Sequence, residues 1–159
     1  MIEVDKKSIV YPLPSNERIA DFEKAYRIEF PSEYKDFLKK YNGATLLTNI
    51  LKIRDFEYIV ERFLCLLDEP NENKIDGWYD LSVVLTQLDD RLIEDEDMVG
   101  MNIIPIASMF AGNFICLDYR NNSDPEIVIW FHEESGEFSP VTDKIADSIN
   151  DFFNMLSKD

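Results

Sequence analysis

The segment Met98–Leu117 contains no charged residue, and it constrains the fold more than any other part of the chain. An apolar helix of about 20 residues is long enough to span a membrane. Here, however, polar and turn-forming residues divide the segment into short pieces: Asn102, Pro105, Ser108, Gly112 and Asn113. Because Gly112 and Asn113 favour a turn, we interpret the segment as two buried strands joined by that turn. A sheet at the centre of the fold is therefore predicted.

Apolar spacing outside this segment predicts further helices and strands. Apolar residues fall on one face of a helix in four segments: 15–27, 31–41, 81–92 and 145–156. Short apolar segments bounded by turn-forming residues predict four strands: 59–67, 103–109, 113–119 and 126–131. Pro31 is expected to end the first helix and begin the second, which Asn42 and Gly43 close. Residues 48–58 show no clear pattern.

The order of these elements favours an α+β fold. Helices come first, strands follow and a helix closes the chain, which predicts a central antiparallel sheet with helices packed around it. A chain of 159 residues, 45% of them hydrophobic, is the size of one domain with its own core. We therefore expect a single domain over residues 1–159. Aromatic residues at helical spacing are assigned to that core: Phe22, Tyr34, Phe37, Tyr41, Phe152 and Phe153.

The net charge of the chain restricts its partners. The sequence holds 32 acidic and 16 basic residues, a formal net charge of −16. Residues 1–45 contain eight of each, so the whole excess lies in residues 46–159. Direct binding of nucleic acid or of an anionic membrane is not expected, because both need clustered Lys and Arg. A surface of one sign attracts a basic protein partner, although it also keeps a protein soluble.

The densest acidic cluster lies between residues 89 and 97. It has six acids, with Arg91 as the only base: Asp89, Asp90, Glu94, Asp95, Glu96 and Asp97. Because carboxylates oppose the dipole at the C-terminus of a helix, we expect residues 94–97 to lie beyond the helix in a loop. Two interpretations stay open. The cluster is either a solvated loop or a partner-binding surface that mimics the charge of a polyanion.

Catalytic and cofactor motifs are not recognisable. His132 is the single histidine, and a structural role at the end of a strand is favoured over catalysis. Residues 95–100 resemble the start of a calcium loop, but Val99 and Ile106 stand at positions that require ligands. The five glycines are not grouped into a phosphate-binding loop. We therefore expect no enzymatic activity, no cofactor and no metal site.

The cysteines and the N-terminus indicate an intracellular protein. Cys65 and Cys116 lie in apolar segments, where a thiol behaves as a small hydrophobic side chain, and no disulfide is expected. They also share no zinc-ligand spacing with His132. Met1–Val10 is charged throughout and has no apolar core of a signal peptide. The expected location is the cytoplasm.

The motifs of the chain resemble those of the SMI1/KNR4 (SUKH) superfamily over residues 19–156. The helical part of the resemblance is Ile19-x-x-Phe22-Glu23, then Phe30-Pro31-x-x-Tyr34-x-x-Phe37-Leu38-x-x-Tyr41-Asn42-Gly43-Ala44. The later part is Ile104-Pro105-Ile106-Ala107, Gly112-Asn113-Phe114-Ile115-Cys116-Leu117-Asp118, Val128-x-Trp130-x-His132-Glu133 and Ile145-Ala146-Asp147-Ser148-Ile149-x-x-Phe152-Phe153. Two features depart from the family pattern: Phe30 replaces the commoner Leu, and residues 68–92 are longer than in compact members.

This resemblance implies an α+β domain that binds proteins and carries no active site. Bacterial members are similar to immunity proteins that neutralise polymorphic toxins, often nucleases, and fungal members are linked to cell-wall assembly and signalling. We therefore expect an immunity protein that binds a basic toxin domain, with the six acids as candidate contact residues. The alternative is a regulatory scaffold module that binds an endogenous partner. The longer segment 68–92 is expected to alter the binding surface.

Overall fold

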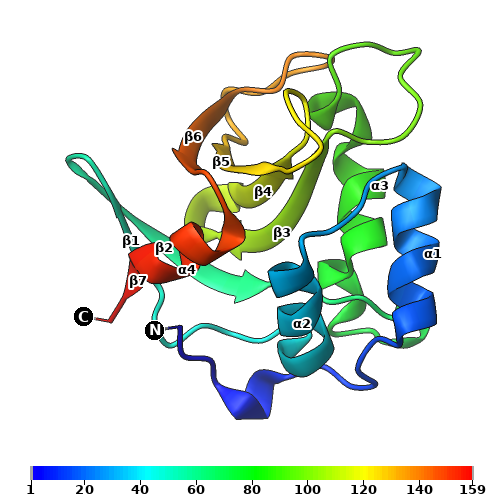
Figure 1. The fold of residues 1–159 in the computed structure, drawn as a ribbon, viewed down its shortest axis with the longest axis vertical. Coiled ribbons are helices and arrows are strands. Elements are labelled where there is room, and N and C mark those ends of the chain that lie inside the picture. The colour runs from blue at the N-terminus through cyan, green and yellow to red at the C-terminus, as the bar shows by residue number, and fades with distance from the viewer. Residues whose placement is uncertain (1, 159) are drawn as a thin grey trace.

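A seven-stranded antiparallel sheet forms the centre of the structure, a computed structural model that describes residues 2–158 (Figure 1). The strands are β1 (Ile50–Ile53), β2 (Phe56–Phe63), β3 (Ile103–Met109), β4 (Phe114–Asp118), β5 (Glu126–Trp130), β6 (Thr142–Ala146) and β7 (Leu156–Ser157), in the sheet order β6-β5-β4-β3-β2-β1-β7. The α-helices in the described part of the chain are α1 (Asn16–Tyr26), α2 (Ser32–Tyr41), α3 (Leu81–Leu92) and α4 (Ile149–Met155). The predicted α+β architecture with a central antiparallel sheet is confirmed.

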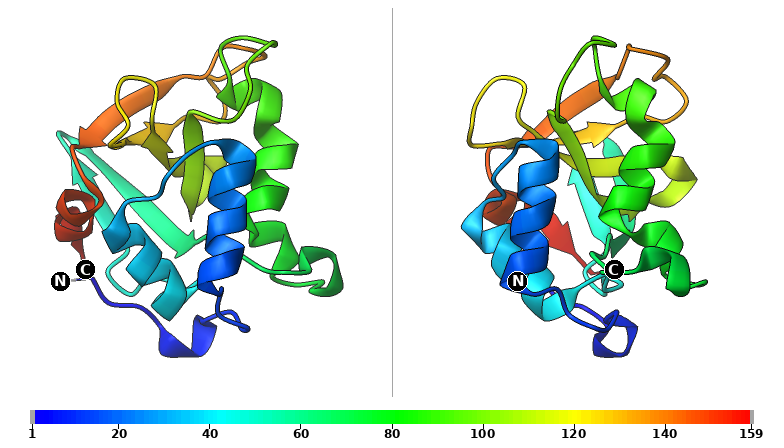
Figure 2. Two further views of the ribbon diagram at one scale, coloured as in Figure 1. Left: turned by 45° about the vertical axis from the view of Figure 1, so that its right-hand side comes forward. Right: turned by 90° about the vertical axis from the view of Figure 1, so that its right-hand side faces the viewer.

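The uncharged segment forms the middle of this sheet, as predicted. Met98–Leu117 supplies β3 and nearly all of β4, and Ala111 and Gly112 take positive φ angles in the turn between them. Successive residues of β3, β4 and β5 are buried, so both faces of these strands are covered. Figure 1 and the left-hand view of Figure 2 show α1 and α3 on the same side of β3. Among residues 2–158, no helix combines the length and apolarity needed to cross a bilayer.

Aromatic side chains join α1 to α2. The Phe22 and Phe30 rings lie 5.3 Å apart, and the Phe30 and Tyr34 rings 4.9 Å apart. Of the six aromatic residues assigned to the core, Tyr41 and Phe153 are partly buried and the other four are buried. Edge-to-face and offset contacts of this kind stabilise a core beyond the area they bury. Core packing is therefore confirmed as the role of these side chains.

The boundaries of α1 and α2 differ slightly from the prediction. Ser15 caps α1, and the helix ends at Tyr26, before Pro31, because Arg27 takes a left-handed conformation with φ 58°. Pro31 is the residue before the first turn of α2, and its carbonyl oxygen accepts from the Lys35 N–H at 3.0 Å. Gly43 closes α2 with φ +68°. A Cβ at Gly43 would lie 2.7 Å from the Val10 side chain, so this position requires glycine.

Three strands, β1, β6 and β7, lie where the sequence pattern was unclear or was interpreted as a helix. β1 and the start of β2 come from residues 48–58, and the predicted strand 59–67 ends at Phe63. The closing helix begins at Ile149, whereas Ile145 and Ala146 belong to β6. Ala146 pairs with Ile127 of β5. β7 pairs with β1, which lies far away in the sequence, and apolar spacing does not reveal such a pairing.

Asp80 links the start of α3 to the chain that follows β2. Its side chain is buried, and Oδ1 accepts from the N–H groups of Ser82 and Val83 at 2.8 and 3.2 Å. Oδ2 accepts from the N–H of Leu67 at 2.8 Å. Burial raises the pKa of this carboxyl, and the three backbone N–H donors oppose the rise. The carboxylate therefore fixes the position of α3 on the sheet.

Replacing Asp80 should destabilise the fold according to the number of N–H donors left unpaired. Asp80→Ala leaves all three without an acceptor and should lower the free energy of unfolding by about 2–4 kcal/mol. Asp80→Asn keeps one oxygen acceptor and should cost roughly half as much. Urea denaturation measures both. The control Ser15→Ala removes an exposed helix cap and should cost about 1 kcal/mol; an equal loss in Asp80→Ala would contradict this role.

Candidate protein-interaction surface

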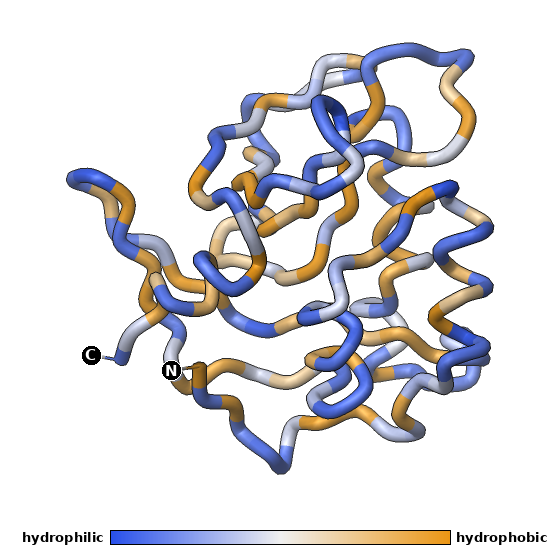
Figure 3. Tube along the Cα trace, in the orientation of Figure 1, coloured by the Kyte–Doolittle hydropathy of each residue, from blue (hydrophilic) through white to orange (hydrophobic). Residues whose placement is uncertain are grey.

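The six predicted acidic residues all lie at the C-terminal end of α3. Asp89 and Asp90 occupy its last turn, and residues 94–97 form the exposed loop that follows, as expected from the helix dipole. Oδ1 of Asp95 accepts from the N–H of Asp97 at 3.0 Å, and the Asp95 carbonyl accepts from Met98 at 3.1 Å. Figure 3 shows this loop as a hydrophilic stretch at the upper right. The acidic side chains therefore project from a defined turn.

Arg91 holds a second loop against this end of α3. Its Nη2 donates to the carbonyl oxygens of His132 and Ser135, the latter at 2.8 Å. The guanidinium lies over the Trp130 ring, 5.1 Å from its centroid, and the Trp130 Nε1–H donates to the Arg91 carbonyl at 3.0 Å. The Phe138 N–H donates to the Asp90 carbonyl at 2.6 Å. Residues 132–138 are thereby fixed beside the end of α3 (Figure 1).

This second loop adds three exposed carboxylates that sequence reasoning did not group with the first six. They are Glu133, Glu134 and Glu137. We call the combined surface the acidic end, which consists of Asp89, Asp90, Glu94, Asp95, Glu96, Asp97, Glu133, Glu134 and Glu137. Arg91 and His132, which join the loops, are 41 positions apart in the sequence. The sequence shows that Glu133 and Glu134 are charged, but it does not show that they lie beside residues 89–97.

Arg120 holds the loop of residues 94–97 in place through charged hydrogen bonds. Its guanidinium donates to both oxygens of the buried Asp118, at 3.0 and 2.9 Å, and to Glu94 Oε1 at 2.7 Å. Nη2 also donates to the Thr142 hydroxyl oxygen at 2.8 Å. Hydrogen bonds from Arg120, first to Asp118 and then to Glu94, raise its pKa above the ordinary value of arginine. Arg120 therefore pairs with both Asp118 and Glu94, and its single positive charge offsets one of their two negative charges.

His132 is placed for a structural role. Its ring Nδ1 lies 3.1 Å from Nη1 of Arg91, and since a guanidinium only donates, Nδ1 is the acceptor. The ring also packs near Trp130, with 6.0 Å between centroids, and the backbone N–H donates to Asn113 Oδ1 at 2.9 Å. A catalytic histidine is oriented by a nucleophile or a carboxylate. In this structure the partner of the ring is an arginine.

The thiols and the carboxylates show no arrangement for redox or metal chemistry within residues 2–158. Both cysteines are buried and free. Burial raises the pKa of Cys65 to about 12 and that of Cys116 well above its ordinary value. In the same part of the chain, no group of three or more His, Cys, Asp or Glu side chains could hold a metal ion.

An open groove of about 640 Å³ lies on another part of the surface. Residues 27–32 form one side, and Tyr119 and residues 122–125 form the other. The Tyr119 hydroxyl donates to the Glu29 carbonyl at 2.8 Å and bridges the two sides. Burial raises the pKa of this phenol above its ordinary value. The lining includes the carboxylates of Glu29 and Asp124 but neither histidine nor cysteine.

Comparison with known proteins identifies the family. A family model for SUKH_6, described as SMI1-KNR4 cell-wall, matches residues 16–153, from the start of α1 to the middle of α4. The chain belongs to this family. SMI1-KNR4 (SUKH) proteins include immunity proteins and are generally non-catalytic. The resemblance noted from the sequence motifs is therefore confirmed.

A bacterial relative supports the same assignment. The chain is 35% identical over 132 residues to the SPbeta prophage-derived uncharacterized protein YokK of Bacillus subtilis (strain 168). The alignment covers 79% of this chain and 66% of that protein. The chain thus spans slightly less than two thirds of the length of this relative.

Removing the Arg91 side chain should release the second loop. Arg91→Ala loses hydrogen bonds to two carbonyl oxygens and the contact with Trp130, so the free energy of unfolding should fall by about 1–3 kcal/mol. Hydrogen exchange at residues 132–138 should accelerate more than exchange in β4. Arg91→Lys should restore little, because an ammonium lacks the planar fork of a guanidinium. Unchanged exchange in the loop would contradict the role of Arg91.

The buried thiols should be inert in the native protein. A thiol-specific reagent at pH 8 should label neither Cys65 nor Cys116, because burial excludes the reagent and the raised pKa suppresses the thiolate. Labelling in denaturant should modify both. Mass spectrometry of the two samples measures the difference, and rapid native labelling at either position would show that the core opens there.

Proposed function

We propose that this chain is a non-enzymatic immunity protein of the cytoplasm that binds a basic toxin domain and covers its active site or substrate groove. The observation that carries the proposal is the acidic end, in which nine exposed carboxylates lie on the last turn of α3 and on two loops joined by Arg91. Membership of a family that includes immunity proteins supports it. Asp89 and Asp90 at the end of α3 and residues 94–97 of the first loop are the proposed contacts, and the second loop extends them.

The acidic end suits a partner that normally binds a polyanion. A nuclease groove is lined with Lys and Arg, and charge-assisted hydrogen bonds from these side chains to carboxylates are strong and directional. The two loops are held by Arg91 and Arg120, so their carboxylates need little ordering when the partner arrives. Attraction between unlike charges also raises the association rate, and this effect weakens with salt.

The first experiment identifies the partner and tests its neutralisation. The tagged chain is incubated with an extract of its native host, bound proteins are eluted with rising salt, and each is identified by mass spectrometry. The expected product is a basic domain that stops bacterial growth when expressed alone. Growth should return when the chain is co-expressed, and His132→Ala should protect as well as wild type. Recovery of basic domains that remain toxic in the presence of the chain would overturn the proposal.

Neutralising the first loop should slow association with that basic domain. The variant Asp95→Asn/Glu96→Gln/Asp97→Asn should reduce the association rate about tenfold at low salt and have little effect at high salt. Glu94 is kept because Arg120 uses it to hold the loop. The matched control is Glu17→Gln/Asp21→Asn/Asp36→Asn, which changes exposed acids on α1 and α2 by the same net charge. Stopped-flow binding across a salt series measures both; equal slowing in the two variants would leave no special role for the loop.

A second candidate function is favoured by the family description, which refers to the cell wall. In this case the chain is a regulatory scaffold module that binds an endogenous protein of cell-wall assembly or signalling. The extract experiment distinguishes the two functions. Recovery of a host protein that is not toxic, together with a cell-wall defect when the chain is deleted, would replace the immunity role with the scaffold role.

A further inference from the structure

The segment that joins β2 to α3 exposes large apolar side chains at the end of α3 opposite the acidic end. Ile75 is 80% exposed, Trp78 is 64% exposed and Tyr79 is 37% exposed. Trp78 also borders a hollow of about 250 Å³ that Pro70, Lys74 and Val83 help to line. Scattered apolar side chains are normal on a protein surface, but a group of them beside a hollow marks an interaction site.

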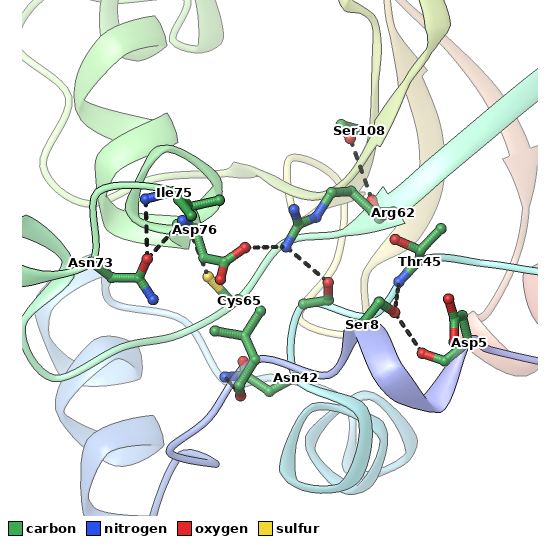
Figure 4. Close-up of polar contacts among 12 residues, drawn as sticks. Asp5, Ser8, Asn42, Thr45, Arg62, Cys65, Asn73, Ile75, Asp76 and Ser108 are labelled. Atoms are coloured by element: carbon green, nitrogen blue, oxygen red, sulfur yellow. Dashed lines mark hydrogen bonds and ion pairs between the residues drawn. The ribbon is translucent and has the colours of Figure 1, made fainter.

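Buried polar contacts hold this segment in place (Figure 4). Arg62 Nη2 donates to the Gly43 carbonyl at 3.0 Å and lies 3.5 Å from Asp76 Oδ1, while its guanidinium stacks 4.1 Å from the Tyr79 ring centroid. Cys65 Sγ donates to the Asp76 carbonyl at 3.5 Å. The exposure of Trp78 therefore belongs to a fixed conformation.

Tight local turns reinforce that conformation. Asn73 Oδ1 accepts from the N–H groups of Ile75 and Asp76, at 3.2 and 2.8 Å. A Cβ at Gly77 would lie 2.2 Å from the Pro70 carbonyl oxygen, so only glycine permits this approach. A preorganised segment loses little conformational entropy on binding, and aromatic side chains presented in this way supply much of the affinity of interfaces.

The charge around these side chains selects the partner. Three exposed acids lie on the same segment: Asp68, Glu69 and Glu72. Lys74 is the one base among residues 68–80. A partner that covers Trp78 therefore has to place basic groups around its apolar contact. A second copy of this chain does not fit, because it carries the same net charge of −16 and would bring like charges together.

We propose that Ile75 and Trp78 form an anchor site for a basic protein surface, with Trp78 inserted into an apolar pocket rimmed by Lys or Arg. The site deepens the proposed function and rests on it for the basic character of the natural partner. α3 has 12 residues and therefore separates the anchor site from the acidic end by about 18 Å, a span that one interface of ordinary size covers. The acidic end then sets the association rate with the partner, and Trp78 sets the dissociation rate.

Selection from a peptide library tests the anchor site without knowledge of the natural partner. A phage library displaying random 12-residue peptides is selected on the immobilised wild-type chain. Enriched peptides should combine Lys or Arg with bulky apolar residues, and their affinity should fall at least tenfold for Trp78→Ser. The matched control is Phe110→Ser, which removes another exposed aromatic side chain, 72% exposed, from a different part of the surface. Circular dichroism confirms that both variants fold.

Tryptophan fluorescence gives a second readout of the same complexes. Trp130 is buried, so acrylamide quenches mainly Trp78, and a bound peptide should protect it. Enrichment of acidic peptides, binding that Trp78→Ser leaves unchanged, or no enrichment would overturn the anchor site. Sedimentation showing a wild-type dimer that Trp78→Ser abolishes would also overturn it and assign the surface to self-association.

The two proposals fail in different experiments. If peptides depend on Trp78 but the chain does not protect against the recovered basic domain, the anchor site stands and the immunity role fails. If the chain protects and Trp78→Ser protects equally, with no Trp78-dependent peptide, the immunity role stands and the anchor site fails.

Discussion

Burial of both faces of β3, β4 and β5 is the constraint on which the rest of the structure depends. Nearly every side chain of these three strands is removed from water, so other parts of the chain have to cover both faces of the sheet there. α3 packs against β3, and α4 packs against β5 and β6. A charge buried in these strands needs an opposite charge, as Asp118 at the end of β4 has in Arg120, and the segment that forms β3 and the rest of β4 carries none.

Polar groups at the margins of this core determine the shape of the surface. Asp80 fixes the start of α3, while Arg91 and Arg120 fix the two loops beside its end. Arg62 does the same for the segment that carries Trp78. Each of these side chains pairs with backbone groups or with an opposite charge, so the cost of its burial is offset. Their common effect is to present exposed side chains on loops that are already ordered.

α3 consequently separates two surfaces of different chemistry. Its C-terminal end presents carboxylates, which act over a distance limited by salt screening, and the segment before its N-terminal end presents a tryptophan, which acts only on contact. Under the proposed function, the carboxylates accelerate association with a basic partner and the tryptophan slows its dissociation. The histidine and the cysteines are engaged in packing or in structural hydrogen bonds, which accords with the generally non-catalytic character of the family.

The sequence by itself determined the α+β class, the family, the central strands and most of the helices, because these follow from local apolar spacing and from motifs that lie close together in the chain. It also located the acidic residues of α3 and its loop. Only the tertiary structure decided that Glu133, Glu134 and Glu137 lie beside them, since Arg91 joins segments 41 positions apart. The same holds for β7, which exists through pairing with the distant strand β1, and for the exposure of Trp78, whose pattern alone did not distinguish it from the buried Trp130.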